Sequence, residues 1–294
     1  MSAEWLLQAA FLPGPVAVQA WEAWLSSVRL DDIDPESFGL LPLLHRNLTA
    51  LGSQHPELGR LKGVRRRTWT ENQLVLRDAA AMLSRLREAR IDAILMEGLA
   101  LVVAYYRDAG LRPVRRSEIL VHREHREAAA ALLALAPRTI VLLTPPLFLG
   151  CPQRIESSWW MSARPICVEE APTRVLSPAD QLFHTLLNGQ RRSGAPQTWW
   201  MADALVILAQ SVDIERVTHL AEELRVTRFL RRALERLDSA LGVAVAPELA
   251  GELSRLRISR ADELEFQYVT RARWHRPMLS WPVGPFRRYR RSRS

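Results

Sequence analysis

Histidine and acidic side chains that stand close together are the first candidates for chemistry in this sequence. His122 and His125 flank Glu124, and a spacing of three residues at the start of a helix lets two imidazoles face one metal ion. Arg123 and Arg126 alternate with them, and their positive charge opposes the binding of a cation. The pattern therefore favours an exposed helix start over a metal site.

Two further titratable groups lie in segments with helical patterns. His184 follows Asp180 by one helical turn, so it could donate to a carboxylate or exchange protons, and we expect a partly buried packing role. Asp203 lies in an apolar stretch, where a buried carboxylate needs a cationic partner. Arg191 and Arg192 are the candidate partners in the sequence, and we interpret this pairing as structural.

Other sites of chemistry are not indicated by the sequence. It contains no P-loop, GxGxxG, HExxH or GxSxG motif. Cys151 and Cys167 do not have the spacing of metal ligands, and a single pair of cysteines in a chain of this size is typical of reduced thiols. The chain opens without a secretory signal and has no long apolar run. We therefore expect a cytoplasmic protein without a membrane span.

The positive charge is confined to one end of the chain. The 294 residues carry 40 basic and 32 acidic side chains, which gives a formal net charge of +8. Residues 271–294 hold eight arginines and no acidic residue, so residues 1–270 are formally neutral. Nucleic acid is therefore not expected as a partner of the body. The Arg-rich tail could contact nucleic acid or an acidic membrane surface, and we favour a solvated or partner-binding tail.

The elements that must position these residues follow from the hydrophobic periodicity. Residues 1–88 form an N-terminal helical region, 89–172 an α/β core, 173–270 a C-terminal helical region and 271–294 the Arg-rich tail. Within the core, strands are predicted at Ile91–Met96, Ser117–Val121 and Thr139–Thr144, with a fourth at Gln153–Met161. Ser177, followed by Pro178, is typical of a helix start.

Five local motifs in this order resemble the uncharacterised nucleotidyltransferase family of bacteria. The similarity covers roughly residues 35–245. The motifs are Gly39–Leu44, Leu95–Leu101 followed by Tyr105 and Tyr106, Gly110–Val121, Leu176–Asp180 and Trp200–Asp203. The resemblance implies an α+β fold, in which a small mixed β-sheet of the polymerase-β type is embedded between N- and C-terminal helical regions.

The resemblance also implies a chemistry, which is nucleotidyl or phosphoryl transfer from Mg²⁺–NTP to an acceptor hydroxyl. In the family, two acids at a spacing of two on one strand hold the metal, and a third acid completes the site. Arg116 occupies the first of these positions, Glu118 the second and Glu156 the third. By the same resemblance, Gly98 lets backbone amides approach phosphate, and Arg112 or Arg116 clamps it.

Arg116 leaves three interpretations open. A guanidinium does not deprotonate at working pH, so the protein is either a catalytically inactive relative, kept for binding or as a scaffold in a biosynthetic pathway, or an active enzyme with a rearranged site. The third interpretation is a different alignment register. Glu97 replaces the family's Lys before Gly98. If the site is active, the acceptor is a small molecule or a peptide; if it is inactive, no cofactor is expected.

Overall fold

The structure is a computed structural model that describes most of the chain. It describes residues 2–134, 139–144, 153–191, 198–260, 262–264 and 266–267. The Arg-rich tail, residues 271–294, lies outside the described residues, as do Cys151 and Arg192. Among the described helices, none combines the length and the apolar character that crossing a bilayer requires.

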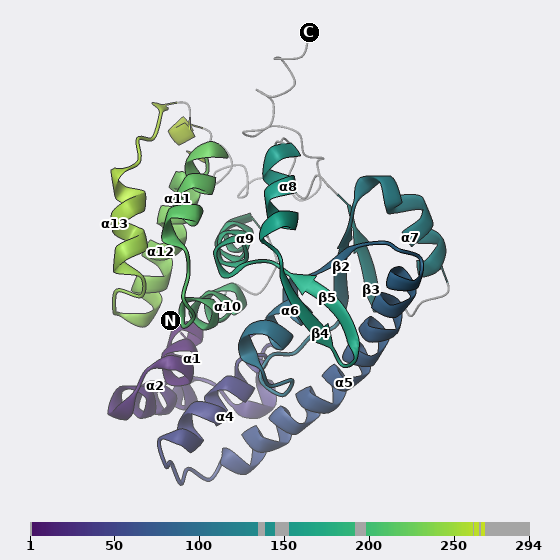
Figure 1. The fold of residues 1–294 in the computed structure, drawn as a ribbon. Helices are drawn as coiled ribbons and strands as arrows, with labels where there is room; N and C mark the ends of the chain where they lie inside the picture. The colour runs from purple at the N-terminus through teal and green to yellow at the C-terminus, as the bar shows by residue number, and fades with distance from the viewer. Residues whose placement is uncertain are drawn as a thin grey trace.

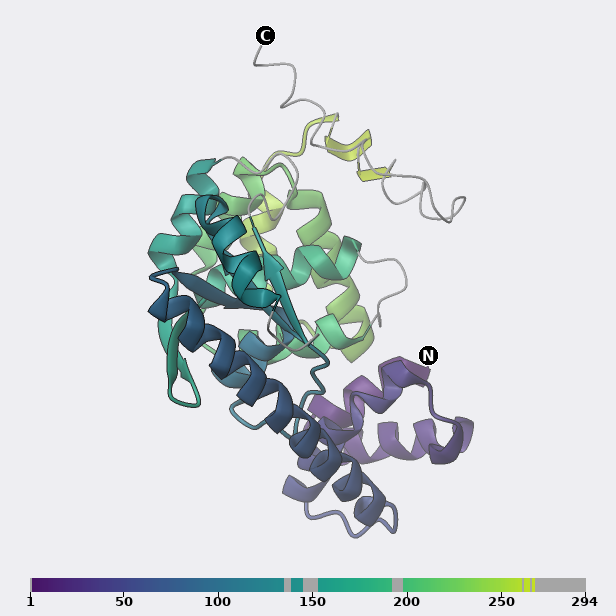
Figure 2. The same ribbon diagram turned by 90° about the vertical axis from the view of Figure 1, so that its right-hand side faces the viewer.

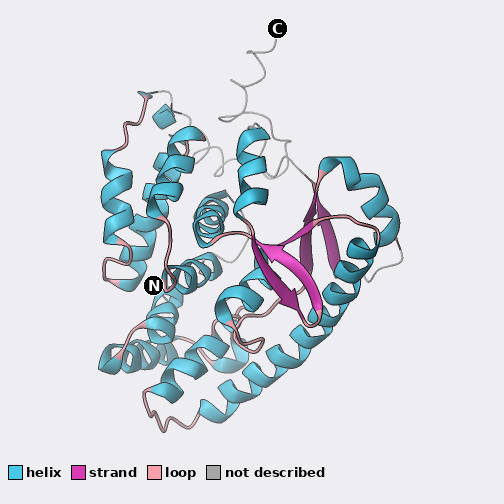
Figure 3. Cartoon of the chain, in the orientation of Figure 1, coloured by secondary structure: helices cyan, strands magenta, loops and turns pink. Residues whose placement is uncertain are grey.

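A five-stranded mixed sheet forms the centre of the fold, as Figure 3 shows. Its strands are β1 (Ala93–Met96), β2 (Ser117–Val121), β3 (Ile140–Leu143), β4 (Arg164–Val168) and β5 (Ala171–Val175), in the spatial order β3-β2-β1-β5-β4. The pairs β1–β2 and β4–β5 are antiparallel, whereas β2–β3 and β1–β5 are parallel. This arrangement confirms the predicted α+β class with a small mixed sheet.

The helical regions that precede and follow the strands in the chain pack around the sheet (Figure 1). The N-terminal helices are α1 (Ser2–Phe11), α2 (Gly14–Ser27), α3 (Pro35–Phe38), α4 (Leu41–Ala50) and α5 (Leu58–Glu88). Between the strands lie α6 (Glu97–Leu101), a π-helical turn (Val102–Tyr106), α7 (Arg126–Leu133) and α8 (Gln153–Ser162). The C-terminal helices are α9 (Pro178–Arg191), α10 (Trp199–Leu208), α11 (Ile214–Glu223), α12 (Thr227–Leu241) and α13 (Pro247–Arg255).

The two faces of the sheet bury different cores, because successive side chains of a strand alternate between its faces. Leu95 and Ile119 join the cluster that α5 contributes with Leu83 and Leu86. The opposite face contributes Ile94, Met96 and Leu120 to the larger cluster that continues through the helical regions. Figure 2 shows α5 running along the outside of the sheet. Each fully buried aliphatic side chain stabilises the fold by about 1.5–3 kcal/mol.

The predicted strand at Gln153–Met161 is wrong, because this segment is the helix α8. Ile155 and Trp159 are both buried at a spacing of four residues, which places them on one face of a helix. The fourth and fifth strands are the hairpin β4–β5, which the sequence reasoning missed. The core boundary expected at residue 172 falls within β5.

Candidate functional site

The candidate site lies where β1 ends and α6 begins. Met96 is the register partner of Glu118 across β1 and β2, so Glu118 lies beside the turn into α6 that Glu97 and Gly98 form. Glu97 has a φ of 54°, a left-handed conformation that is uncommon for a residue other than glycine. Such strained backbone is concentrated at functional sites, and the strand pairing brings the residues of two of the motifs together here.

Arg116 and Glu118, for which the resemblance implies the positions of two metal-binding acids, form an ion pair with each other. Both Nε and Nη2 of Arg116 lie 2.8 Å from Oε1 of Glu118. The Glu118 side chain is buried, with 9% of its surface exposed, whereas 56% of the Arg116 side chain is exposed. The guanidinium therefore covers the carboxylate oxygen that a metal ion would need.

Glu97 contacts two side chains of α9. Asn188 donates from Nδ2 to Oε1 of Glu97 over 3.0 Å, and the same nitrogen lies 3.0 Å from Nδ1 of His184. His184 is buried, and its Nδ1 lies 3.4 Å from the Glu97 carboxylate. The carboxylate that faces His184 thus comes from the turn after β1, and this contact joins α9 to the candidate site.

Arg112 forms a bidentate ion pair with Asp203. Its Nε donates to Oδ1 over 2.7 Å and its Nη2 to Oδ2 over 2.8 Å. Tyr106 also donates to Oδ1 of Asp203 over 2.8 Å. Among the described side chains, Arg112 is therefore the cationic partner of Asp203, where Arg191 or Arg192 was expected. Arg192 and the side chain of Arg191 lie outside the described residues.

Burial and the charge of Asp203 together determine the pKa values of Arg112 and Tyr106. Burial works against the charged form of Arg112, but the Asp203 carboxylate outweighs it and holds the pKa of Arg112 above its ordinary value. Burial also raises the pKa of Tyr106 well above its usual range, with Asp203 adding to the effect. Arg112 stays charged and Tyr106 neutral, so the cluster is a fixed structural link between the core and α10.

Gly98 serves the packing of Arg112. A Cβ atom at residue 98 would collide with Nη1 of Arg112, and the Asp203 contacts hold that guanidinium in place. The guanidinium thus lies against the Gly98 backbone, where the family resemblance implies phosphate contact. Both residues predicted to bind nucleotide at this turn are therefore engaged with each other.

Glu156 lies on α8, beside the opposite end of β2 from Glu118. Trp160, one turn further along α8, stacks on His122 with ring centroids 3.7 Å apart. His122 follows β2 and lies four residues beyond Glu118, which is about 13 Å along a strand. Burial raises the pKa of Glu156, and Arg123 opposes the shift. The structure thus places Glu156 close enough to Arg123 for the guanidinium to act on its carboxyl group.

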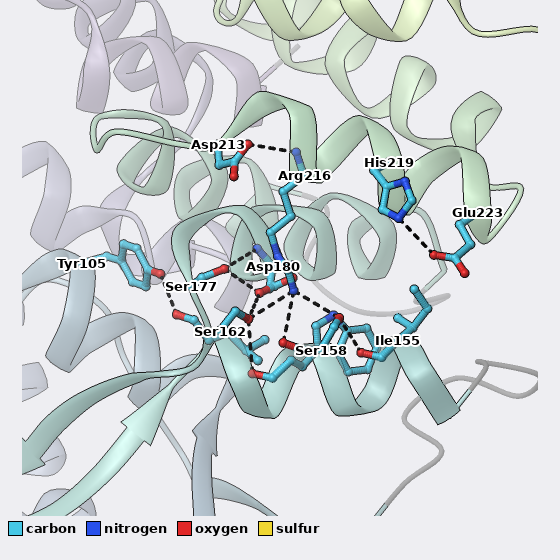
Figure 4. Close-up of polar contacts among 12 residues, drawn as sticks. Tyr105, Ile155, Ser158, Ser162, Ser177, Asp180, Asp213, Arg216, His219 and Glu223 are labelled. Atoms are coloured by element: carbon cyan, nitrogen blue, oxygen red, sulfur yellow. Dashed lines mark hydrogen bonds and ion pairs between the residues drawn. The ribbon is translucent and has the colours of Figure 1, made fainter.

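A buried polar network that sequence reasoning missed connects α8, α9 and α11 (Figure 4). The Asp180 side chain is fully buried and accepts hydrogen bonds from Arg216 Nε at 2.8 Å and Ser162 Oγ at 2.6 Å. Ser177 Oγ donates to Asp180 over 2.5 Å and accepts from the Asp180 backbone amide. The helix-start pattern at Ser177 was the signal for half of this network. Nothing in the local sequence pointed to Arg216.

Mg²⁺ does not fit the residues at the candidate site. The ion takes oxygen ligands in a near-octahedral arrangement and commonly uses one or two carboxylates. Arg116 neutralises Glu118, and Glu156 lies by the other end of β2. Across the described parts of the chain, no group of three or more His, Cys, Asp or Glu side chains could hold a metal ion.

Two similarities relate this chain to known proteins. The model of a family described as uncharacterised nucleotidyltransferase matches residues 36–136. The chain is also similar to the crystal structure of an antigenic nucleotidyltransferase-like protein from Paracoccidioides brasiliensis, with 15% identity and a TM-score of 0.44, over 65% of this chain and 96% of that one. No curated protein matches the chain. The matched stretch, residues 36–136, includes β1, β2 and the turn at Gly98, so this part of the chain is similar to the uncharacterised nucleotidyltransferase family.

Proposed function

We propose that this nucleotidyltransferase-like protein is catalytically inactive and acts as a binding or scaffold protein. The observation that carries the proposal is the ion pair between Arg116 and Glu118, with two guanidinium nitrogens 2.8 Å from one carboxylate oxygen. The side chain supplies the positive charge that a metal ion brings to active members of such families. Glu118 is thereby satisfied without Mg²⁺.

Electrostatics support this proposal at both halves of the site. Two unit positive charges 4 Å apart repel each other by about 4 kcal/mol at an effective dielectric constant near 20, so Arg116 opposes a divalent cation at Glu118. Glu97 adds a carboxylate at the start of α6, where the family resemblance implies an approaching triphosphate. The negative charges of the Glu97 carboxylate and of a triphosphate would repel each other, so Glu97 opposes nucleotide binding as well.

Transfer of a nucleotidyl or phosphoryl group to a small-molecule or peptide acceptor is the competing function. It is favoured by the exposure of Arg116, whose side chain is 56% accessible. In that function Arg116 would clamp a phosphate, as guanidinium groups do through paired N–H donors. The two functions differ in whether the wild-type protein binds Mg²⁺–NTP.

The test compares the wild type with the double variant Arg116→Asp, Glu97→Lys, which restores the family's residues. Calorimetry and thermal unfolding are measured with each of the four common NTPs, with and without Mg²⁺. A nucleotide at 100 times its Kd stabilises the folded state by about 2.7 kcal/mol. We expect no response from the wild type and a Mg²⁺-dependent response from the double variant.

Arg115→Asp, Glu97→Lys is the matched control, because Arg115 is an exposed neighbour of Arg116 and the net charge change, zero, is the same. Micromolar Mg²⁺–NTP binding by the wild type, abolished by Glu118→Gln, would sink the inactive assignment and support the rearranged enzyme. A response from this control as large as that from the Arg116→Asp, Glu97→Lys variant would mean that an acid at position 116 is not what permits binding.

A further inference from the structure

The outer face of α5 carries positive charges in a row. Lys62, Arg66 and Arg77 are all exposed. At 100° per residue they lie within about 60° of one another around the helix, and their positions span about 22 Å along its axis. Figure 2 shows α5 in front of the sheet in that view, with its length along the outside of the molecule.

The three cations of this row differ from the other arginines near the start of α5 in having no acidic partner. Three flanking arginines are each paired: Arg60 with Asp31, Arg65 with Asp108 and Arg67 with Glu71. Within the part of the chain that the structure describes, Lys62, Arg66 and Arg77 make no ion pair. The positive charge along the row is therefore not neutralised locally.

A tryptophan lies beside these cations. Trp69 follows Arg66 by three residues, and 51% of its surface is exposed. Trp21, Trp24 and Trp159 are buried in the core, with 3% exposure or less. A ring that stays in water contributes nothing to folding. Its exposure next to unpaired cations therefore indicates a surface that can bind a ligand through both the ring and the charges.

We propose that the α5 stripe, which consists of Lys62, Arg66, Trp69 and Arg77, binds single-stranded nucleic acid. Cationic side chains along a track neutralise successive phosphates, and an exposed aromatic ring provides a surface on which a base stacks. The stripe supplies both components on one straight element. This role does not depend on the site at Gly98.

The arrangement of charge favours nucleic acid over a protein or a membrane. Arg and Trp are common in protein interfaces, but the core of such an interface is depleted in charged residues. The stripe has cations at its centre and exposed apolar side chains, Trp69 and Leu74, on its two sides. A helix that binds a membrane surface inserts a broad apolar face. The apolar face of α5 is instead buried against the sheet, with Leu83 and Leu86.

The neutral composition of residues 1–270 led us not to expect nucleic acid at the body of the protein. The fold modifies that expectation, because acidic residues that balance the total do not neutralise the α5 stripe. Glu71 and Asp78 on the same helix are engaged by Arg67 and Thr139. Residues 1–270 are therefore neutral in total but still present a positively charged surface along α5.

The test measures binding of fluorescein-labelled dT20 to the full chain by anisotropy at several salt concentrations. The triple variant Lys62→Gln, Arg66→Gln, Arg77→Gln should lower the slope of log K against log salt by about 2, since each phosphate contact with a single strand contributes about 0.7. Trp69→Ala should weaken binding about fivefold or more, and Trp69→Phe should restore most of it. Circular dichroism checks that each variant is folded.

A control triple variant, Arg29→Gln, Arg115→Gln and Arg126→Gln, removes the same charge from exposed arginines elsewhere. We expect it to change the slope by less than half as much. The proposal is overturned if both triple variants act equally, if Trp69→Ala has no effect, or if the wild type does not bind dT20 at low salt. Loss of binding to poly-glutamate or to phosphatidylserine vesicles, with dT20 binding unchanged, would assign the stripe to a protein or a membrane instead.

Discussion

At the residue scale, the candidate site is defined by charged side chains that satisfy one another. Arg116 covers Glu118, Arg112 is held by Asp203, and Glu97 meets His184. None of these arginines or acids is left as an isolated buried charge, which would be costly in a protein interior. The ion pairs that fill the site therefore also stabilise the fold. Removing one member of a pair leaves the other as an unpaired charge, which lowers the free energy of unfolding.

Arg112→Ala should lower the free energy of unfolding by about 3–5 kcal/mol, because it leaves the buried Asp203 carboxylate without its cation. Urea denaturation measures this loss. The double variant Arg112→Leu, Asp203→Leu should lose less than Arg112→Ala does, since no buried charge remains. An exposed control, Arg115→Ala, should stay within about 0.5 kcal/mol of the wild type. Equal losses for Arg112→Ala and Arg115→Ala would contradict the structural role.

Glu156 should make stability depend on pH in an identifiable direction. Burial raises its folded-state pKa above the ordinary value of 4.5, so the unfolded chain loses its proton first as the pH rises. Its contribution to stability is therefore neutral at low pH and becomes unfavourable above about 4.5. Glu156→Gln should accordingly gain stability relative to the wild type between pH 4 and pH 7. Urea unfolding at both pH values checks this, and a constant difference would refute it.

At the scale of elements, a single buried ion pair joins three helices. Arg216 of α11 reaches Asp180 of α9 and the hydroxyls of Ser158 and Ser162 on α8, as Figure 4 shows. This geometry explains why α8 is held against α9. It also fixes the helices that stand next to the sheet, including the stretch of α9 that presents His184 to Glu97.

Arg216→Ala should therefore destabilise the protein by about 3–5 kcal/mol, because Asp180 is left buried without a cation. Arg216→Lys should recover part of the loss, since an ammonium group restores the charge but not the several hydrogen bonds of the planar guanidinium. Arg154→Ala removes the exposed arginine of a pair with Glu223 and should cost at most about 1 kcal/mol. A similar cost for Arg216→Ala and Arg154→Ala in chemical denaturation would show that the network is not a structural link.

At the scale of the whole molecule, the distribution of charge matters more than its sum. The net charge of +8 resides in residues 271–294, yet the folded body still presents a row of unpaired cations on α5. The same body places the Arg116 guanidinium at a position where the family resemblance implies a metal-binding acid. Both features concern where charges lie after folding.

The proposed inactive site predicts that Mg²⁺ has little effect on the stability of the whole protein. Adding millimolar MgCl₂ or EDTA should shift the melting temperature by less than about 1 °C, because a ligand stabilises only the state that binds it. Differential scanning calorimetry measures this. Glu118→Gln should respond to Mg²⁺ in the same way as the wild type. A stabilisation by Mg²⁺ that Glu118→Gln removes would restore Glu118 to the role of a metal ligand.

The sequence by itself determined the α+β class, the strands β1, β2 and β3, the helix start at Ser177 and the presence of Arg116 where a metal-binding acid is expected. These features depend on local periodicity or on a motif, and both can be read within a few residues. Only the tertiary structure decided that Arg112 pairs with Asp203, 91 residues away, that Glu97 faces His184, and that Glu156 lies apart from Glu118. Such pairings depend on how elements distant in the chain pack together. The segment Gln153–Met161 shows the same limit, because its helix buries Ile155 and Trp159 in a core cluster built from elements distant in the chain.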